Sequence, residues 1–210
     1  MITLREICEE GNNPSERKSK IKLVCIGDSL TGWNNYAPRE EWPVPTFPIY
    51  LEEQLGNQEI ANFGIAGGTS DISLDLARNA TEYLPNLSLY VCGFGTNDLG
   101  MNEKVIATSQ SILRNIGQMY SFLKENKKDL ILFNVPPAKL SMFPEYLRKV
   151  LVLKREYHNL KLKEFCDQRK IPLVDVYSDL RDGHFEDGLH TNELGAKLIA
   201  DKISKRIYSK

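Results

Sequence analysis

Short apolar runs alternate with longer amphipathic stretches along most of this 210-residue sequence. The runs over residues 21–26, 87–92, 130–135 and 172–176 are typical of buried strands, and residues 57–62 are a further, less apolar strand candidate. In the stretches between them, apolar residues recur every three or four positions, which predicts helices over residues 49–55, 70–83, 105–123, 145–169 and 192–208. This alternation predicts an α/β fold, with a parallel sheet covered by helices on both faces.

Four short polar motifs lie between these predicted elements. Three begin where a predicted strand ends, and the fourth lies in the loop before the last predicted helix. They are Gly27-Asp28-Ser29-Leu30, Asn62-Phe63-Gly64, Gly95-Thr96-Asn97-Asp98 and Asp187-Gly188-Leu189-His190. Active sites of parallel α/β proteins form outside the carboxyl ends of the strands, so we expect these motifs to meet at one edge of the sheet.

Ser29 follows the first predicted strand directly, within a Gly-Asp-Ser-Leu turn. Its hydroxyl could serve as a nucleophile at the edge of the sheet, with its backbone N–H facing the same space. Ser29 could instead cap a following helix, and for an isolated Gly-Asp-Ser tripeptide the cap is the favoured interpretation. Asp28 is expected to anchor the turn by accepting hydrogen bonds from nearby backbone.

Two further motifs offer hydrogen-bond donors for the oxyanion that forms when an ester carbonyl is attacked. Gly64 has no side chain to shield its N–H, and Asn97 can donate from its amide. Each also has a structural alternative, Gly64 as a turn glycine and Asn97-Asp98 as a helix cap or loop anchor. A phosphate-binding loop is disfavoured, because neither glycine-rich segment completes a G-x-G-x-x-G spacing.

The chain has three histidines, and His190 is the best candidate for a general base. Asp187 precedes it by three residues, so its carboxylate can reach Nδ1–H within a tight turn and stabilise the imidazolium. His184 is the alternative because aspartates flank it, but we expect it to shape the loop. His158 lies inside a predicted helix and is expected to be a surface or packing residue.

The four motifs, in this order, resemble those of the SGNH hydrolases, also called the GDSL esterase/lipase family. The resemblance covers the chain from about residue 21 to the C-terminus, and the serine, glycine, asparagine and histidine motifs are all present. It implies a three-layer α/β/α sandwich with a five-stranded parallel, flavodoxin-like sheet. It also implies an esterase that needs neither a metal nor another cofactor.

The resemblance further implies a role for each marker residue. Ser29 would attack the ester, His190 would transfer protons, and Asp187 would orient His190. The oxyanion would be held by the N–H groups of Ser29 and Gly64 and by the amide of Asn97. Members of the family hydrolyse many esters, thioesters and acetylated sugars, and some transfer acyl groups, so the resemblance does not select a substrate.

Three functional alternatives therefore follow from the sequence. The leading one is a serine esterase acting on small-molecule or carbohydrate esters with short or modest acyl groups, since the chain has no inserted lid domain. The second is an acyltransferase that uses the same acyl-Ser29, and the third is a non-catalytic ligand-binding module on the same fold. Four aromatic residues could contact substrate or simply pack against the domain, namely Trp33, Tyr36, Trp42 and Phe94.

Composition narrows the partners and the setting. A formal net charge of −1 and a pI near 6.3 give no electrostatic reason to expect nucleic acid or a membrane as partner. The four cysteines lack metal-binding or disulfide spacing, and Cys25 and Cys92 are expected to be buried thiols.

The ends and the length of the chain lead to two further expectations. No signal peptide or membrane-spanning run is evident, so a cytoplasmic protein is expected. The length suits a single domain with residues 1–20 as an extension, and the sequence does not determine the oligomeric state.

Overall fold

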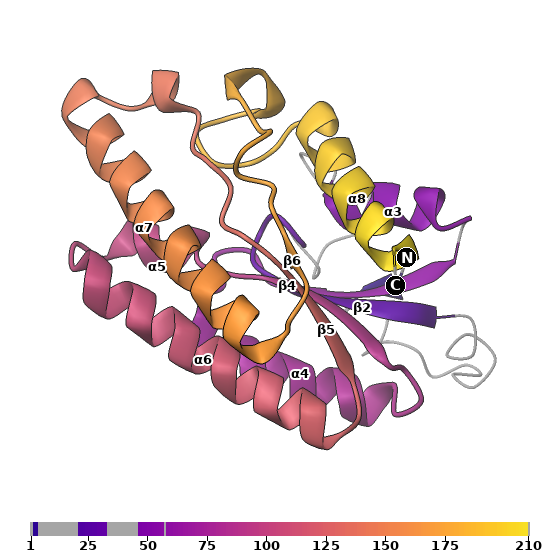
Figure 1. The fold of residues 1–210 in the computed structure, drawn as a ribbon. Helices are drawn as coiled ribbons and strands as arrows, with labels where there is room; N and C mark the ends of the chain where they lie inside the picture. Colours follow the sequence, from indigo (N-terminus) through magenta and orange to yellow (C-terminus); the bar gives the residue numbers. More distant parts are fainter. Residues whose placement is uncertain (1, 4–20, 33–45, 57, 210) are drawn as a thin grey trace.

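The computed structural model describes residues 2–3, 21–32, 46–56 and 58–209, and these residues contain one parallel sheet (Figure 1). Its strands lie in the order β1-β3-β2-β4-β5-β6. Their bounds are β1 Ile2–Thr3, β2 Ile21–Gly27, β3 Glu59–Gly64, β4 Leu89–Gly93, β5 Asp129–Phe133 and β6 Leu173–Val174. The five predicted strands correspond to β2 through β6, and their order is the flavodoxin-like order, which confirms the predicted sheet.

Strand β1 is an addition that the sequence did not predict. It pairs in parallel with β3 at the edge of the sheet, with Ile2 opposite Ala61 and Thr3 opposite Asn62. Two residues are too few to show any periodicity, so only the pairing with β3 identifies them as a strand.

Helices cover both faces of the sheet, and the predicted three-layer sandwich is confirmed (Figure 1). One face carries α3 (Phe47–Gln54) and α8 (Glu193–Tyr208). The other carries α4 (Ser73–Tyr83), α6 (Val105–Glu125) and α7 (Glu145–Arg169). A short helix, α5 (Thr96–Met101), follows β4, and 3-10 turns cover Ser70–Ile72, Leu140–Met142 and Asp182–His184.

The sheet separates two hydrophobic cores, because successive side chains of a strand point to opposite faces. In β2, Val24 and Ile26 pack in the core beneath α4, α6 and α7, while Leu23 and Cys25 pack beneath α3 and α8. Cys92 of β4 lies in the first core, so the expectation of buried thiols at Cys25 and Cys92 is confirmed. Burial raises the pKa of both thiols, which keeps them protonated and unreactive.

Local signals explain why the helix bounds could be predicted. Asn192 caps α8, since its Oδ1 accepts a hydrogen bond from the N–H of Gly195 at 3.1 Å. Helix α7 begins directly after Pro144 and ends before Lys170, whose φ of 57° is left-handed and closes the helix. None of the helices in the described ranges combines the length and apolar composition that crossing a bilayer requires.

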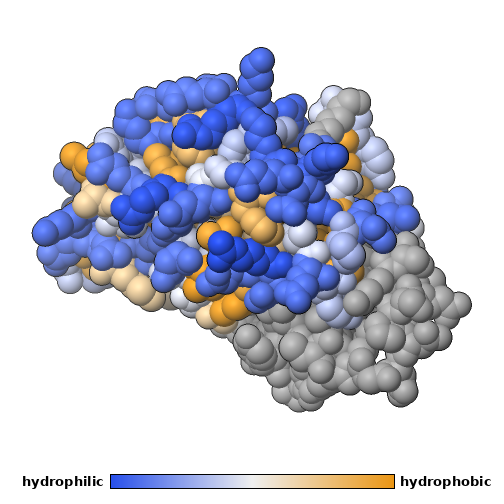
Figure 2. All heavy atoms as spheres, turned by 90° about the horizontal axis from the view of Figure 1, so that it is seen from below, coloured by the Kyte–Doolittle hydropathy of each residue, from blue (hydrophilic) through white to orange (hydrophobic). Residues whose placement is uncertain are grey.

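Seen from below the view of Figure 1, hydrophilic residues cover most of the described surface, and hydrophobic residues lie between them in small groups (Figure 2). The chemistry-bearing motifs lie at the carboxyl ends of the strands. Parallel register places Gly27 at the end of β2 opposite both Gly64 of β3 and Gly93 of β4. A Cβ at Gly27 would lie 2.1 Å from Thr31 Oγ1, so only glycine fits this turn. The first three motifs therefore lie side by side.

Candidate active site

A hydroxyl, an imidazole and a carboxylate form a continuous hydrogen-bonded chain at this edge of the sheet. Ser29 Oγ lies 3.1 Å from His190 Nε2, and His190 Nδ1 lies 2.7 Å from Asp187 Oδ2. Ser29 and His190 are 161 positions apart in the sequence, so only the fold brings them together. Both distances are within hydrogen-bonding range, and such an arrangement can activate a serine hydroxyl as a nucleophile.

The turn that presents Ser29 is held by Asp28. The carbonyl of Asp28 accepts hydrogen bonds from the N–H groups of Thr31 and Gly32, both at 3.0 Å, and its Oδ1 accepts from the N–H of Leu30 at 3.0 Å. No helix begins within described residues 30–32, so these residues give Ser29 no helix to cap. The backbone N–H of Ser29 has no acceptor in the described part of the chain.

The Asp28 carboxyl group is buried beneath this turn. Burial raises its pKa to about 7, and the hydrogen bond from Leu30 only partly opposes that effect. Asp28 accepts hydrogen bonds from the backbone of its own turn, so its role is to hold the turn, as its position in the motif suggested.

The turn around Asp187 fixes the orientation of His190. Asp187 Oδ1 accepts hydrogen bonds from the N–H groups of Leu189 at 2.7 Å and His190 at 2.8 Å, which leaves Oδ2 for the imidazole. Burial raises the pKa of Asp187, but the hydrogen bonds from His190 and Leu189 outweigh burial and hold it below its ordinary value. An ionised Oδ2 accepts from Nδ1–H, so Nε2 is the ring nitrogen that can accept a proton from Ser29.

Residues outside the motif support the Asp187 turn from one side. The N–H of Lys139 donates to the carbonyl of Gly188 at 3.0 Å. The ring of Phe143 packs on the same peptide, and a Cβ at Gly188 would lie only 2.9 Å from that ring. The segment between β5 and α7 thus restrains the loop that carries His190.

Asn97 lies in the first turn of α5, at the edge of the same space. Its Nδ2 donates to the carbonyl of Gly68 at 2.9 Å, and a side-chain amide has a second N–H that remains available. The neighbouring Asp98 accepts from Ser70, at 3.0 Å from the N–H and 2.7 Å from the hydroxyl. These bonds tie α5 to the loop of residues 65–70. Burial raises the pKa of the Asp98 carboxyl group above its ordinary value.

A cavity of about 240 Å³ opens in front of these groups. It is lined by Ser29, Ala66, Gly67, Thr96, Asn97, Leu189 and His190. The hydroxyl, the imidazole and the Asn97 amide therefore face one small space, as expected for motifs at neighbouring strand ends.

The geometry corrects the expectation for Gly64. Its N–H donates to Asn62 Oδ1 at 2.9 Å, and Gly64 does not line the cavity. A Cβ at Gly64 would lie 2.3 Å from the nitrogen of Gly32, so its glycine is required for close packing of β3 against the Ser29 turn. The missed signal was Asn62, because an Asn two residues before a backbone N–H commonly accepts from it.

Gly67 lines the cavity together with Ser29 and Asn97, although the sequence motifs did not predict it as a site residue. Its φ of +72° is a conformation that glycine readily adopts. The N–H of Gly67 has no acceptor among the residues that the structure describes.

The aromatic predictions have different outcomes. Trp33, Tyr36 and Trp42 lie outside the described residues. Phe94 was expected near substrate, but it is only 3% exposed, belongs to the core beneath α6 and does not line the cavity. The prediction for Phe94 is wrong because its side chain points from the strand end into the apolar layer.

The other two histidines have structural roles. His184 Nδ1 accepts a hydrogen bond from the N–H of Arg181 at 3.0 Å, so it shapes the loop as expected. His158 is a packing residue, fully buried on α7 with Nδ1 3.0 Å from Ser109 Oγ. Burial lowers the pKa of His158 to about 4, so it stays neutral.

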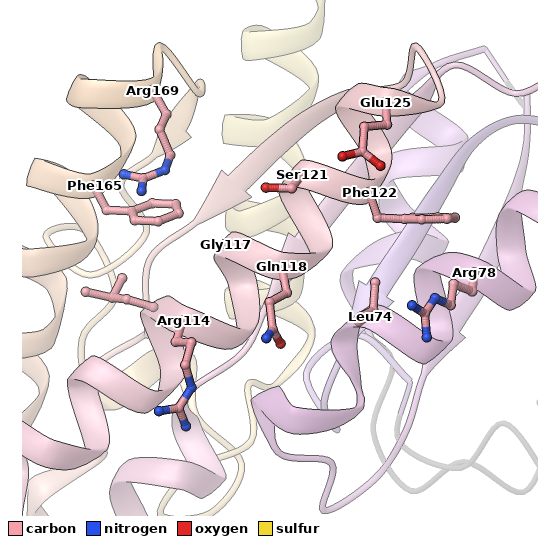
Figure 3. Close-up of a pocket in the computed structure, with 11 residues that line it drawn as sticks. Leu74, Arg78, Arg114, Gly117, Gln118, Ser121, Phe122, Glu125, Phe165 and Arg169 are labelled. Atoms are coloured by element: carbon pink, nitrogen blue, oxygen red, sulfur yellow. The ribbon is translucent and has the colours of Figure 1, made fainter.

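A second depression, of about 510 Å³, lies over α6 between α4 and α7 (Figure 3). Arg78, Arg114 and Arg169 surround it together with Phe122 and Phe165, and the Arg169 guanidinium lies 3.9 Å from the centre of the Phe165 ring. Its lining includes no histidine or cysteine, so the smaller cavity is the one with acyl-transfer groups. Among the described residues, no cluster of His, Cys, Asp and Glu is arranged to hold a metal ion.

The family assignment agrees with this geometry. A family model described as "GDSL-like Lipase/Acylhydrolase family" matches residues 25–198, which is most of the chain and includes all four motifs. The chain therefore belongs to the GDSL-like lipase/acylhydrolase family.

Solved structures share the fold over nearly the whole chain. A GDSL-like lipase from Bacteroides thetaiotaomicron is 24% identical with a TM-score of 0.70, and the match covers 91% of this chain and 90% of that one. A carbohydrate acetylesterase from Sinorhizobium meliloti is 18% identical with a TM-score of 0.66, and the match covers 90% of this chain and 99% of that one. An uncharacterised protein of Mycoplasma pneumoniae is 24% identical over 63% of this chain. The matched region spans only 16% of that protein's length.

Proposed function

We propose that this protein is a serine esterase that hydrolyses carboxylic esters with short acyl groups, acetylated carbohydrates among them, through an acyl-Ser29 intermediate. The observation that carries the proposal is the chain of contacts from Ser29 Oγ to His190 Nε2 at 3.1 Å and from His190 Nδ1 to Asp187 Oδ2 at 2.7 Å. Ser29 and His190, the first two members of this chain of contacts, line the 240 Å³ cavity.

The first half-reaction acylates Ser29. As Ser29 Oγ bonds to the ester carbonyl carbon, its proton passes to His190 Nε2 and the carbonyl electron pair moves onto the oxygen. Asp187 stabilises the imidazolium that results. When the tetrahedral intermediate collapses, the bond to the alcohol oxygen breaks and His190 returns the proton to that oxygen, so a neutral alcohol leaves.

The second half-reaction frees the enzyme. A water molecule attacks the acyl carbon while His190 Nε2 takes one of its protons. The bond from the acyl carbon to Ser29 Oγ then breaks, and His190 returns the proton to Oγ. A carboxylic acid is released and the starting hydroxyl is restored.

Three N–H groups would hold the oxyanion in both steps: those of Ser29 and Gly67 and the second amide N–H of Asn97. Support comes from their position around the cavity and from the lack of acceptors for the two backbone groups within the described ranges. Loss of one such donor typically lowers kcat by about a hundred- to a thousandfold. Gly67 replaces Gly64 in this proposal, because Gly64 donates to Asn62.

The cavity also supports the proposed acyl size. Its volume of about 240 Å³ and its small lining residues Ala66 and Gly67 suit an acetyl group better than a long chain. Because the structural neighbour from Sinorhizobium meliloti is a carbohydrate acetylesterase, acetylated sugars are the first natural substrates to test.

The proposal is tested by hydrolysis of p-nitrophenyl acetate and by labelling with a fluorophosphonate. We expect Ser29→Ala to abolish labelling and to lower kcat by several orders of magnitude, whereas Ser121→Ala, at an exposed serine on α6, changes neither. Undiminished hydrolysis by Ser29→Ala would refute the mechanism. Adding alcohol or sugar acceptors measures transfer, and a dominant transfer product would make the protein an acyltransferase.

A further inference from the structure

Helix α5 carries the Asn97 amide and has six residues. The last carbonyls of any α-helix lack partners within the helix. The carbonyl of Asp98 in α5 accepts from Asn102 Nδ2 at 2.9 Å. The carbonyl of Leu99, in the helix, and that of Asn102, which directly follows it, need donors from elsewhere.

Lys154 of α7 supplies both donors. Its Nζ lies 3.1 Å from the carbonyl oxygen of Leu99 and 2.6 Å from that of Asn102. The Lys154 residue is only 7% exposed, and no carboxylate pairs with it in the described part of the chain. The end of α5 is therefore the hydrogen-bonding environment of this ammonium group.

The interaction restrains both partners. A buried ammonium group is unfavourable unless its N–H groups are bonded, and the C-terminal end of a helix has the partial negative charge that suits it. Without Lys154, the buried carbonyl of Leu99 would lose its donor, and α5 would shift toward water. Asn97, less than one turn away along α5, would move with it.

We propose that Lys154 is a positioning residue for ester hydrolysis: its ammonium group fixes α5 so that the Asn97 amide points into the cavity beside Ser29. The inference rests on the proposed role of Asn97 as an oxyanion donor. A displacement of about 1 Å in a catalytic group can lower the rate about a hundredfold, so a small shift of α5 is sufficient.

The first experiment compares Lys154→Met with Lys163→Met. Lys163 lies on the same helix but on its solvent side, where it pairs with Asp167 at 2.6 Å. With p-nitrophenyl acetate we expect Lys154→Met to lower kcat by about ten- to a hundredfold with KM changed less than about threefold, and Lys163→Met to leave both constants unchanged. A folded Lys154→Met variant with wild-type kcat would overturn the proposal.

The second experiment separates positioning from a general loss of packing. In a double-mutant cycle with Asn97→Ala, we expect Lys154→Met to lower kcat by less than about threefold further, because the group it positions is already absent. Full additivity would show that Lys154 does not act through Asn97. We expect Lys154→Arg to recover part of the lost kcat, since its guanidinium can donate to both carbonyls, and no recovery would count against the proposal.

Two further outcomes are distinguished by the same set of variants. If Lys154→Met does not fold, Lys154→Gln takes its place in the cycle, because it removes the ammonium group and keeps a polar side chain at the site. If Asn97→Ala retains wild-type kcat, Asn97 is not an oxyanion donor, and the positioning role of Lys154 fails with it. If Asn97→Ala is impaired and folded Lys154→Met is not, only the positioning role fails.

Discussion

Replacing Asp187 with asparagine tests the central geometry, because the substitution keeps the shape of the side chain and removes its charge. Asp187 makes three hydrogen bonds within the turn, two of them from the backbone to Oδ1 and one from His190 Nδ1 to Oδ2. The asparagine oxygen can keep the two backbone bonds. The asparagine NH₂ group cannot accept from Nδ1–H, so the imidazole will favour the tautomer with its proton on Nε2.

That tautomer cannot accept the proton of Ser29, although Oγ still lies about 3.1 Å away. The analogous substitution in the serine-protease triad lowers kcat by about ten-thousandfold. We expect Asp187→Asn to lower kcat on p-nitrophenyl acetate by a similar factor, which corresponds to roughly 5 kcal/mol of transition-state stabilisation. The backbone bonds remain, so we expect the midpoint of thermal unfolding to change little.

The assay is steady-state hydrolysis near neutral pH, with Asp167→Asn as the control. Asp167 is an exposed carboxylate on α7 that pairs with Lys163, and its replacement should leave kcat unchanged. A folded Asp187→Asn variant with more than about a tenth of wild-type kcat would refute the assigned role, since the imidazole would then need no oriented tautomer.

The remaining predictions concern stability, measured by urea unfolding. Gly64→Ala should destabilise the protein strongly, because its Cβ would lie 2.3 Å from the nitrogen of Gly32. Gly67→Ala places a Cβ in open space at a φ of +72°, so it should lower the free energy of unfolding by only about 1–2 kcal/mol. Equal destabilisation by the two substitutions would contradict the argument that Gly64 alone is required for close packing. Burial raises the pKa of Asp28 to about 7, so its contribution to stability is complete below about pH 4 and is lost as pH rises through 7. The difference in unfolding free energy between wild type and Asp28→Asn should therefore change by up to about 4 kcal/mol over that interval, and a constant difference would contradict the burial argument.

Elements governed by local interactions could be read from the sequence. The strands β2 to β6 and the helices α6 and α7 follow from hydrophobic periodicity, and Asn192 marks the start of α8 through a bond within one turn. The contact of His190 with Asp187 is local in the same sense, because three residues of a tight turn are enough to form it.

Elements governed by distant contacts could not be read in this way. The two-residue β1 exists only because β3 pairs with it, and Phe94 lies in the core because of how the helices cover the sheet. The choice between Gly64 and Gly67 depends on which N–H faces the cavity, and that depends on backbone dihedral angles and on the Asn62 side chain. Periodicity and motif spacing contain neither piece of information.

The sequence by itself determined the layered α/β fold, the family and the residues available for acyl transfer, since local propensities and short motifs suffice for these. Only the tertiary structure decided that Ser29 meets His190 across 161 positions, that Gly67 faces the cavity and that Lys154 supports the helix of Asn97. The physical reason is that hydrogen bonds form between groups within about 3 Å in space, and only packing of the whole chain sets those distances.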